Sequence, residues 1–403
     1  MTAQQRPAAL RLIAFIVFID MAGIGLIMPV MPSLITGLAA VSVGRAAEIG
    51  GFLLFAYAAM QFLFAPVIGG LSDRFGRRPV LLVTLAALGI DYALMAWAPT
   101  LAWLFVGRMI SGIMGATWVA ANSSVADSVP PEQRGAVFGL LGGAGASGFV
   151  LGPIIGGLLG QFGDRIPFWI ASALALIGTG IGWFILAETL PAEKRRAFSL
   201  ARANPLGSLT QMAKRPLVLG LLLAIFFMQL SAQATNATWS FYGTLKFGWS
   251  PLTTGLTITF YGVLLATMQG LLVGRAIARF GAVQTAWISL MFGIPSYLII
   301  AFAPSTAVII VGIVCGAMTG LCFPAMQSLM TARIDEDAQG ELQGAIGSTV
   351  SLTAVIGPIV MTSVFGAWAD NQGLYFPGAP FIVSAVLIGI AVIILRTTLR
   401  RYA

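Results

Sequence analysis

Histidine is absent from this chain of 403 residues, and cysteine occurs only twice. Without histidine, Ser-His and Cys-His catalysis are excluded, and so is a zinc site built from the usual cysteine and histidine ligands. Cys315 and Cys322 lie seven residues apart in one apolar stretch, where they are expected to fill the protein core. No cluster of residues resembles an enzyme active site. We therefore expect no catalytic residues, no metal site and no cofactor.

Charged residues are also scarce. They make up 9% of the chain, against 58% hydrophobic residues, whereas a soluble domain usually carries about 25% charged residues. Apolar stretches of roughly 20 residues, the length needed to cross a bilayer core, recur from end to end between short polar breaks. The pattern predicts an all-α membrane protein with twelve spans, at residues 11–36, 47–71, 79–98, 101–125, 135–161, 167–188, 216–243, 252–279, 283–303, 306–331, 341–369 and 376–399.

The positions of the 22 basic residues predict the orientation in the membrane. The net charge of +8 could indicate a nucleic-acid partner. If both termini lie on one side, however, 18 basic residues fall on that side, Arg108 lies within a span, and only Arg45, Arg165 and Lys246 fall opposite. An excess of basic residues is typical of cytoplasmic segments. We therefore predict a monomeric multi-pass protein of the inner membrane, with cytoplasmic termini, lipid around it and no nucleic-acid partner.

A polar stretch divides the first six spans from the last six. It runs from Glu188 to Arg215 and contains six basic residues together with Pro191 and Pro205, a composition that favours a connecting segment. We predict an N-terminal six-helix bundle over residues 1–188, a cytoplasmic linker over 189–215 and a C-terminal six-helix bundle over 216–403.

The two halves repeat one another at a constant offset of 205 residues. The matches are Gly69 with Gly274, Arg74-Phe75-Gly76 with Arg279-Phe280-Gly281, Ala98-Pro99 with Ala303-Pro304, Gly107 with Gly312, Gly115 with Gly320, Gly135 with Gly340, Gly139 with Gly344, and Gly152-Pro153 with Gly357-Pro358. Parallel repeats are one plan on which transporters are built, with the substrate site near the bilayer midplane between the halves. We expect two pseudo-symmetric bundles that work by alternating access.

Four charged residues of the first half have no charged counterparts in the second. At the same offset, the residues that correspond to Asp20, Asp73, Asp91 and Arg108 are Ile225, Ala278, Ser296 and Ile313. Protonatable groups are thus concentrated in the first half. Our hypothesis is that this half handles protons, while the second half mainly shapes a substrate cavity.

Three charged residues stand out deep inside the expected spans. A charge there costs at least about 2.5 to 3.5 kcal/mol and marks a functional site by default. Asp20 lies about 13 Å deep in the first span and has no basic partner in that span, which favours a role in proton exchange. Asp91 and Arg108 each lie eight residues from the turn at Pro99-Thr100, and so at similar depth in antiparallel neighbours. They could form a fixed ion pair or a proton-exchange site.

The loop after the second span combines glycine, aspartate and arginine. Glycine permits a tight turn, and Asp73 can cap the following backbone or pair with an arginine. Such contacts could hold the cytoplasmic side closed, although a basic turn that only sets orientation is the alternative. The candidate gating residues are Gly69, Asp73, Arg74, Gly76, Arg77 and Arg78.

The fifth span is rich in glycine. Glycines allow close approach of another helix, and Pro153 removes a backbone hydrogen bond and permits a bend. The span is predicted to pack tightly and to flex, with close packing alone as the alternative. Its glycines are Gly135, Gly139, Gly142, Gly143, Gly145, Gly148, Gly152, Gly156, Gly157 and Gly160.

Three motifs resemble those of the major facilitator superfamily. The pattern Gly69-x-x-x-Asp73-Arg74-x-Gly76-Arg77-Arg78 is similar to its cytoplasmic-loop signature, which gates conformational change. Leu104-x-x-x-Arg108-x-x-x-Gly112 is similar to its fourth-span motif, whose arginine is tied to proton transfer. Gly148-x-x-x-Gly152-Pro153-x-x-Gly156-Gly157 is similar to the fifth-span motif of antiporters.

The tetracycline/proton antiporters are a closer resemblance, and it covers nearly the full chain. It rests on Asp20-Met-Ala-Gly23-Ile-Gly25 with Pro29 and Pro32, on Tyr57 to Gln61, on Met228-Gln229 with Gln233 and Trp239, on Phe247-Gly248-Trp249 with Gly255, and on Gln269 with Gly274 and Arg279. The resemblance implies export of tetracycline as a divalent-metal complex in exchange for protons, so magnesium could travel with the substrate. Asp20 and Asp91 match the acids of the first and third spans in that family.

The chain departs from this family in two places. The ninth span has no acid and reads Phe292-Gly293-Ile294-Pro295-Ser296 around the expected position, and Leu265 lies close to the place of an eighth-span histidine found in some members. Polar uncharged groups beside aromatic ones favour an amphipathic organic ligand. The candidates for the substrate cavity are Gln61, Asn122, Gln229, Gln233, Asn236, Trp239, Gln269 and Gln327.

These patterns lead to a transporter rather than an enzyme. The first hypothesis is proton-coupled efflux of small amphipathic drugs, with tetracyclines as the first class to test. The second is a proton-coupled transporter of a metabolite or sugar on the same fold, against which the fifth-span motif argues. The third is a receptor or lipid-handling protein that moves no solute, which the matched halves and the embedded acids disfavour.

Overall fold

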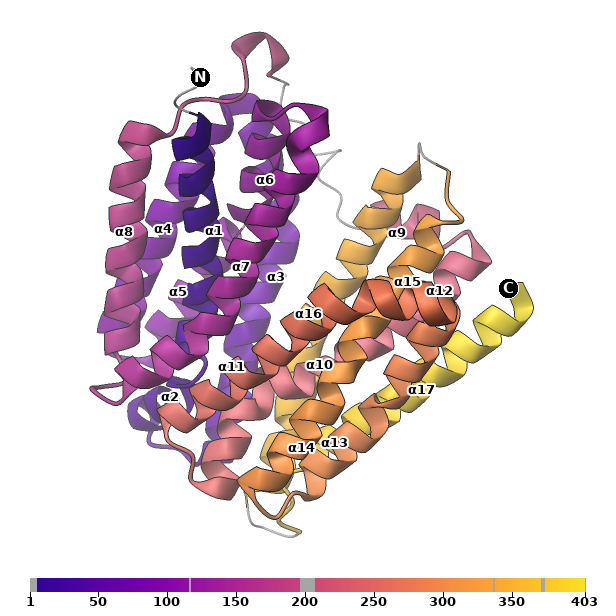
Figure 1. The fold of residues 1–403 in the computed structure, drawn as a ribbon. Helices are drawn as coiled ribbons and strands as arrows, with labels where there is room; N and C mark the ends of the chain where they lie inside the picture. Colours follow the sequence, from indigo (N-terminus) through magenta and orange to yellow (C-terminus); the bar gives the residue numbers. More distant parts are fainter. Residues whose placement is uncertain (1–5, 116, 196–206, 336–337, 371–373, 403) are drawn as a thin grey trace. The chain divides into compact units, whose positions relative to one another are not determined.

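A computed structural model describes residues 6–115, 117–195, 207–335, 338–370 and 374–402 of the chain (Figure 1). Within these ranges the regular structure is helical, and they contain no strand. The α-helices are α1 (Arg6–Ile27), α2 (Met31–Ala39), α3 (Val43–Phe75), α4 (Arg77–Trp97), α5 (Leu101–Met114), α6 (Thr117–Ser128), α7 (Pro131–Gly160), α8 (Ile166–Ile185), α9 (Gly207–Met212), α10 (Pro216–Phe247), α11 (Pro251–Thr267), α12 (Val273–Met291), α13 (Gly293–Phe302), α14 (Thr306–Ala317), α15 (Cys322–Thr331), α16 (Gln339–Ala369) and α17 (Ala379–Tyr402). Shorter elements are the 3-10 turns η1 (Ala192–Lys194) and η4 (Met318–Leu321) and the π-helical segment η3 (Met268–Leu272).

Ten stretches of the described residues are long and apolar enough to cross a membrane. One of them, Pro251–Phe302, contains two predicted spans, because its helices are separated only by a turn at Gly281, where φ is 77°. The predicted span 101–125 is divided between α5 and α6, and α5 is a shorter apolar helix. With these two adjustments the structure agrees with an all-α membrane fold of twelve spans.

The first predicted span, residues 11–36, is not a single helix. It is divided into α1, which ends at Ile27, and α2, which begins at Met31. Pro29 and Pro32 flank the new start, and a proline cannot donate the backbone hydrogen bond that continues a helix. The prediction of one unbroken span over residues 11–36 was therefore wrong after Ile27, where α1 ends.

The chain forms two compact units. Unit 1 comprises Met1–Ala40, Ala56–Asn204 and Ser250–Thr259, and unit 2 comprises Val41–Phe55, Pro205–Trp249 and Phe260–Ala403. The helices α3 and α11 thus each begin in one unit and continue in the other. Shifting Val41–Phe55 by 205 positions covers Ser250–Thr259, so the exchanged segments correspond in the sequence repeat. Residues 196–206 of the predicted linker lie outside the described residues, and the predicted bundle limits stay a prediction.

The core of unit 1 lies around α1. Ile16 and Ile13 from α1 pack with Leu85 of α4, Val125 of α6 and Leu141 of α7, all nearly without exposed surface. Figure 1 shows α1 among α4, α7 and α8. Because α1 contacts each of these helices, it determines the position of Asp20 relative to the residues they carry.

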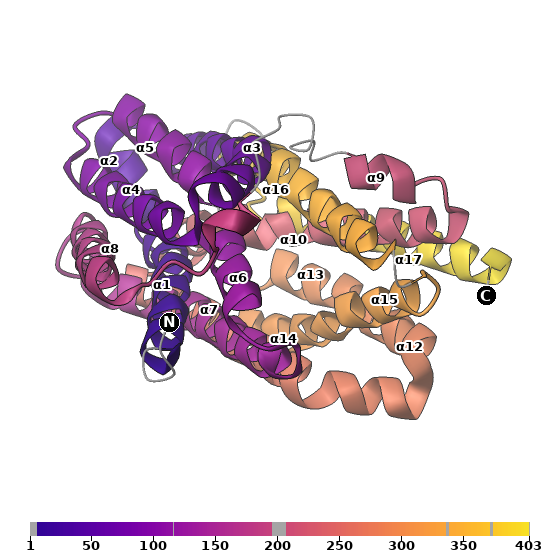
Figure 2. The same ribbon diagram turned by 90° about the horizontal axis from the view of Figure 1, so that it is seen from above.

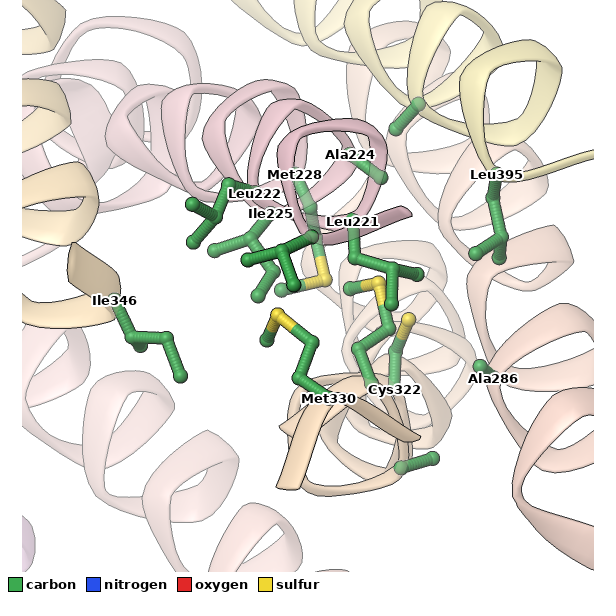
Figure 3. Packing of buried hydrophobic residues seen from close by; sticks show 14 of the residues in the cluster. Leu221, Leu222, Ala224, Ile225, Met228, Ala286, Cys322, Met330, Ile346 and Leu395 are labelled. Atoms are coloured by element: carbon green, nitrogen blue, oxygen red, sulfur yellow. The ribbon is translucent and has the colours of Figure 1, made fainter. Parts of the chain in front are cut away.

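The core of unit 2 lies between α10, α12, α15 and α17 (Figure 3). Leu221, Ile225 and Met228 of α10 face Cys322 and Met330 of α15, and flexible methionine side chains fill irregular gaps well. Figure 2 shows α12 and α15 side by side, in agreement with their contacts.

The two cysteines differ in their surroundings. Cys322 is fully buried, as predicted, whereas Cys315 is only partly buried and both are free thiols. The prediction of core filling therefore holds for Cys322 and is wrong for Cys315, which lies on a more open side of α14.

Candidate functional site

Asp91 and Arg108 form a buried ion pair in unit 1. Asp91 lies on α4 and Arg108 on α5, which follow each other across the turn at Pro99-Thr100. Arg108 Nη2 lies 3.7 Å from Asp91 Oδ2, and the Asp91 side chain is fully buried. Their equal distance from the turn along the chain brings the two charges side by side, because antiparallel neighbours run at the same rise per residue.

The pair has few hydrogen bonds to support it. Neither oxygen of Asp91 makes a well-formed hydrogen bond within the described residues, although the Ser111 hydroxyl faces it. Arg108 directs Nη2 at the sulfur of Met95, 3.0 Å away, and its guanidinium carbon lies 5.7 Å from the centre of the Tyr57 ring. Buried charges with incomplete hydrogen bonding are poorly compensated for their lost solvation. A proton or ligand that satisfies one of them can therefore compete with the ion pair.

Two glycines of α5 allow this close arrangement. A Cβ atom on Gly107 would lie 2.6 Å from Asp91 Oδ1, and one on Gly112 would overlap the carbonyl oxygen of Tyr57 on α3. Gly112 belongs to the fourth-span motif, but Gly107 was noted only as part of the repeat. Its place one residue before Arg108 was the available signal, because the side chain of the preceding residue determines how near α4 can approach.

Gln61 connects α3 to the end of α5. Its amide nitrogen donates to the carbonyl oxygen of Gly115 at 2.9 Å and to the Tyr57 hydroxyl at 3.2 Å. Tyr57 in turn lies against Arg108. The predicted cavity residue Gln61 thus belongs to the surroundings of the ion pair and orients the tyrosine beside it.

Asp20 approaches the same region from α1, with 6% of its surface exposed. Tyr92 follows Asp91 on α4, is 1% exposed and lies in the same region. Its hydroxyl packs so tightly on Gly23 that a Cβ there would overlap it, and the phenol lies within electrostatic range of Asp20, Asp91 and Arg108. Tyr92 is not among the predicted site residues, although its position next to Asp91 was a signal.

Arg77 is the centre of an ionic network at the loop after α3. Its Nη1 lies 2.6 Å from Asp73 Oδ1, and its Nε donates to Asp127 Oδ2 on α6 at 2.9 Å. It also donates to the Ser72 hydroxyl at 3.2 Å. The loop signature therefore contributes one arginine that ties together α3, α4 and α6.

Glu188 completes this network from the segment after α8. Its Oε1 accepts hydrogen bonds from the backbone N–H groups of Arg77, Thr189 and Leu190, each at 2.9 Å. Gly76 has φ of 105°, a value that favours glycine, and a Cβ there would overlap Glu188 Oε2. Sequence reasoning missed Asp127 and Glu188, which lie 50 and 111 residues from Arg77 in the chain.

The remaining loop residues have other contacts. Arg78 donates to the Trp183 carbonyl oxygen at 2.6 Å and lies over its ring, while Arg74 lies over the neighbouring Phe75 ring. Gly69 lies within α3, six residues before its end. The structure thus brings Asp73, Gly76 and Arg77 together and leaves Gly69, Arg74 and Arg78 outside the network.

Three glycines of α7 form a line of contact with α1. Cβ atoms on Gly148, Gly152 and Gly156 would each meet a carbonyl oxygen of α1, belonging to Phe18, Ala22 and Leu26 respectively. At Gly152 the distance would be 2.6 Å. The spacing of four residues keeps them on one face of the helix. The fifth-span motif therefore builds a backbone-to-backbone helix contact that no larger residue would allow.

The other face of α7 packs against the start of α11. A Cβ on Gly157 would lie 2.5 Å from the Pro251 carbonyl oxygen, and one on Gly255 would overlap that of Pro153. Thr259 donates to the Val150 carbonyl oxygen at 2.8 Å. All three contacts are internal to unit 1, since Ser250–Thr259 belongs to it.

The prediction of close packing is wrong for the first half of this helix. Cβ atoms on Gly135, Gly139, Gly142 and Gly143 would meet nothing within 4 Å. Here α7 packs on the core through Val137, Leu141 and Ala144 instead. Two helices that cross at an angle separate away from their crossing point, so only the glycines near Pro153 meet α1.

Unit 2 contains a neutral counterpart of the ion pair. Ser296 on α13 and Gly312 on α14 correspond to Asp91 and Gly107 at the offset of 205. Ser296 Oγ donates to the Gly312 carbonyl oxygen at 2.8 Å and is 3% exposed. Ser296 thus fills the position at which the ninth span has no acid, and its hydroxyl is satisfied by the neighbouring backbone.

Comparison with known proteins identifies the family to which these arrangements belong. The model of the Major Facilitator Superfamily matches residues 13–358 and 221–402. The chain belongs to this superfamily. The tetracycline resistance protein of class C from Escherichia coli is 37% identical over 379 residues, or 94% of each chain. The class E protein from Escherichia coli is 36% identical over 387 residues, covering 94% of this chain and 93% of its own.

Solved structures share the fold. A bacterial homologue of the human lysosomal transporter Spinster, in an inward-facing and occupied conformation, matches with a TM-score of 0.84 at 16% identity, covering 100% of this chain and 98% of its own. The major facilitator fold and the family together make this chain a multi-pass membrane transporter and not an enzyme.

The predicted cavity residues of this major facilitator protein are divided between the units. Gln61 and the partly buried Asn122 lie in unit 1. Gln229, Gln233, Asn236, Trp239, Gln269 and Gln327 lie in unit 2. The shared substrate cavity therefore stays a prediction.

The six candidates of unit 2 have different surroundings. Trp239 is 3% exposed and lies in an aromatic cluster with Trp249 and Phe381, while Gln233 packs against Gly357 of α16. Gln327 donates to Gln343 at 2.9 Å. Asn236 and Gln269 are exposed, and Gln229 is partly buried. Within the described part of the chain, no three His, Cys, Asp or Glu residues group as a metal site would require.

Proposed function

We propose that this protein exports amphipathic drugs in exchange for protons, with tetracyclines as the first class to test. The observation that carries the proposal is the poorly hydrogen-bonded pair Asp91–Arg108, 3.7 Å apart and close to Asp20 and Tyr92. An acid buried in this way is suited to taking up a proton. The resistance to tetracycline in the names of the full-length relatives supports the same substrate class.

The proposed cycle couples the ion pair to the cavity. A proton from the outer face binds Asp20 or Asp91, and neutral Asp91 no longer holds Arg108. The cavity then opens inward, where drug replaces the proton. The protein acts as a monomer in the inner membrane with both termini in the cytoplasm, which is the orientation favoured by its basic residues.

The proposed substrate is lipophilic, and a metal is optional. Ser296, whose hydroxyl is occupied by Gly312, supplies no carboxylate at the ninth-span position. If tetracycline is carried as a magnesium complex, the ion is part of the substrate, and the uncharged groups Gln229, Gln233 and Gln269 meet it. Transport of tetracycline with and without magnesium distinguishes a metal complex from the drug alone.

The test measures proton movement in everted membrane vesicles by fluorescence quenching while drugs are added. Wild-type protein is expected to release protons from the vesicles when tetracycline enters. Asp20→Asn and Asp91→Asn should abolish this response, and Asp335→Asn, which removes a carboxylate that is 82% exposed, should not. Coupled transport that persists in both Asp20 and Asp91 variants would refute the assignment. Proton movement together with the solute, in the opposite sense, would favour the metabolite or sugar transporter instead.

A further inference from the structure

Two arginines of unit 2 lie near a turn that corresponds to the loop of unit 1, but without the acidic residues found there. Arg279-Phe280-Gly281 corresponds to Arg74-Phe75-Gly76, at the start of the ionic network around Arg77. At the same offset, the three acids of that network are replaced by apolar residues, and Arg77 by an alanine. The replacements are Ala278 for Asp73, Ala332 for Asp127, Ile393 for Glu188 and Ala282 for Arg77. Unit 2 therefore keeps the turn and an arginine without the carboxylates.

A second arginine, Arg275, lies one turn before Arg279. Both side chains are exposed. Arg275 Nη1 donates to the Leu271 carbonyl oxygen at 2.6 Å, and the guanidinium of Arg279 lies over the Phe280 ring. No carboxylate among the described residues forms an ion pair with either arginine. The two positive charges thus remain available to an anion.

Both arginines line a cavity of about 280 Å³ in unit 2. The rest of its wall is almost entirely apolar and includes Leu272, Ala276, Phe280, Ile288, Met318 and Leu321. The two hydroxyls in the lining, Thr285 and Ser289, donate to carbonyl oxygens of their own helix. The arginines therefore line the cavity mainly through the carbon atoms of their side chains, and their exposed guanidinium groups lie next to an apolar wall.

Two irregular segments create this space. Leu272 ends the π-helical segment η3, while Met318 and Leu321 bound the 3-10 segment η4, and the two segments contact each other. Neither a π- nor a 3-10-helix keeps the side-chain rows of an α-helix, so ridges and grooves cannot interlock there as they do between α-helices. The cavity therefore follows from the backbone geometry of η3 and η4.

We propose that this cavity binds an anionic phospholipid, with its phosphate at Arg275 and Arg279 and its first acyl carbons on the apolar wall. Guanidinium groups bind phosphate through paired hydrogen bonds, and basic pockets beside membrane helices bind acidic head groups. The volume is slightly below the roughly 300 Å³ at which small-molecule sites begin, so it holds only part of a lipid.

The remainder of the lipid has an apolar surface to follow. Ile288, Met291 and Phe292 occupy one face at the end of α12 and are 48%, 46% and 37% exposed. A free phosphate ion would gain nothing from this face or from the apolar wall, which is why a lipid is the favoured occupant. In the orientation proposed above, the site belongs to the cytoplasmic leaflet. It does not depend on which drug is exported.

Native mass spectrometry of the full-length protein in detergent tests the proposal. Delipidated protein is titrated with phosphatidylglycerol and with phosphatidylcholine of the same chains, which carries no net charge. Wild-type protein should retain phosphatidylglycerol in preference. The double variant Arg275→Gln/Arg279→Gln should bind phosphatidylglycerol about thirty-fold more weakly. Two positive charges near the head group are lost, and their effects on the affinity multiply.

Two further variants separate the site from general surface charge. Arg396→Gln/Arg400→Gln removes two exposed arginines of α17 that do not line the cavity, and should leave the affinity unchanged. Ala276→Trp keeps both arginines but fills the cavity, and should weaken phosphatidylglycerol binding. Glycerol 3-phosphate, which has no acyl chain, should not displace the lipid.

The proposal fails if wild-type protein binds the two lipids equally. It also fails if the Arg275/Arg279 variant keeps its affinity, or if Ala276→Trp has none of the expected effect. Displacement of the lipid by millimolar glycerol 3-phosphate would assign the site to a soluble phosphate compound instead. The lipid comparison on wild-type protein requires no variant to fold.

Discussion

Gly107 faces Asp91 so closely that a Cβ atom on Gly107 would lie 2.6 Å from Asp91 Oδ1. The missing side chain lets α5 carry Arg108 to within 3.7 Å of the same carboxylate. In unit 2 the corresponding residues, Gly312 and Ser296, are also in contact, through a hydrogen bond of 2.8 Å. The repeat thus preserves a contact between two helices while exchanging a charged residue for a neutral one.

Gly107→Ala is expected to destabilise the protein by about 1 to 3 kcal/mol, because a methyl group has no room between the helices. The ion pair should be displaced with it, so proton-coupled transport should fall further than the loss of folded protein explains. Thermal unfolding in detergent and vesicle transport measure the two effects. Gly180→Ala is the matched control, since a Cβ there would meet nothing within 4 Å. Equal behaviour of the two variants would contradict the steric argument.

Ser296→Asp should destabilise unit 2, because it buries a carboxylate where the corresponding arginine is replaced by Ile313. The expected cost is about 2.5 to 3.5 kcal/mol, as for other charges within a span. Adding Ile313→Arg should recover part of the stability by rebuilding the pair of unit 1. Thermal unfolding of the single and double variants gives the coupling energy. No coupling between positions 296 and 313 would show that the two units differ at this contact.

Arg77 and Asp73 should be strongly coupled, whereas Arg74 should be nearly independent of both. Arg77→Ala leaves Asp73 and Asp127 without their shared cation, and residues in one network typically show coupling of about 0.5 to 3 kcal/mol. Arg74 is exposed, and its guanidinium lies over the neighbouring Phe75 ring. Double-mutant cycles on thermal unfolding and on transport rate measure the coupling. Additive effects of Arg77→Ala and Asp73→Ala would exclude the network as a unit.

Gly156→Ala should be much more damaging than Gly139→Ala, although both lie on α7. A Cβ on Gly156 would overlap the Leu26 carbonyl oxygen, and backbone cannot move aside as a flexible side chain can. Gly139 faces open space, where alanine should stabilise the helix by roughly 0.5 to 1 kcal/mol. The yield of folded protein and its unfolding temperature measure the difference. Similar losses at both positions would mean that α7 packs along its whole length.

The sequence by itself determined the class of the protein and much of its plan. Scarce charge and recurring apolar stretches required a helical membrane fold, because a backbone in lipid must satisfy its own hydrogen bonds. The offset of 205 residues indicated the repeat, and the segments that α3 and α11 exchange between the units follow the same offset. The charges of Asp91 and Arg108 stood out because charge within a span is costly.

Only the tertiary structure decided which residues surround those two charges and the loop residue Arg77. Tyr92 joins the surroundings of Asp91 by packing on Gly23 of α1, while Asp127 and Glu188 join the network around Arg77 from distant segments of the chain. The same holds for the glycines of α7, of which those near Pro153 meet α1 and those near Gly139 meet nothing. Composition identifies a helix that can pack closely, but the crossing angle determines where it does. That angle depends on every side chain in the contact, and no local pattern in the sequence encodes it.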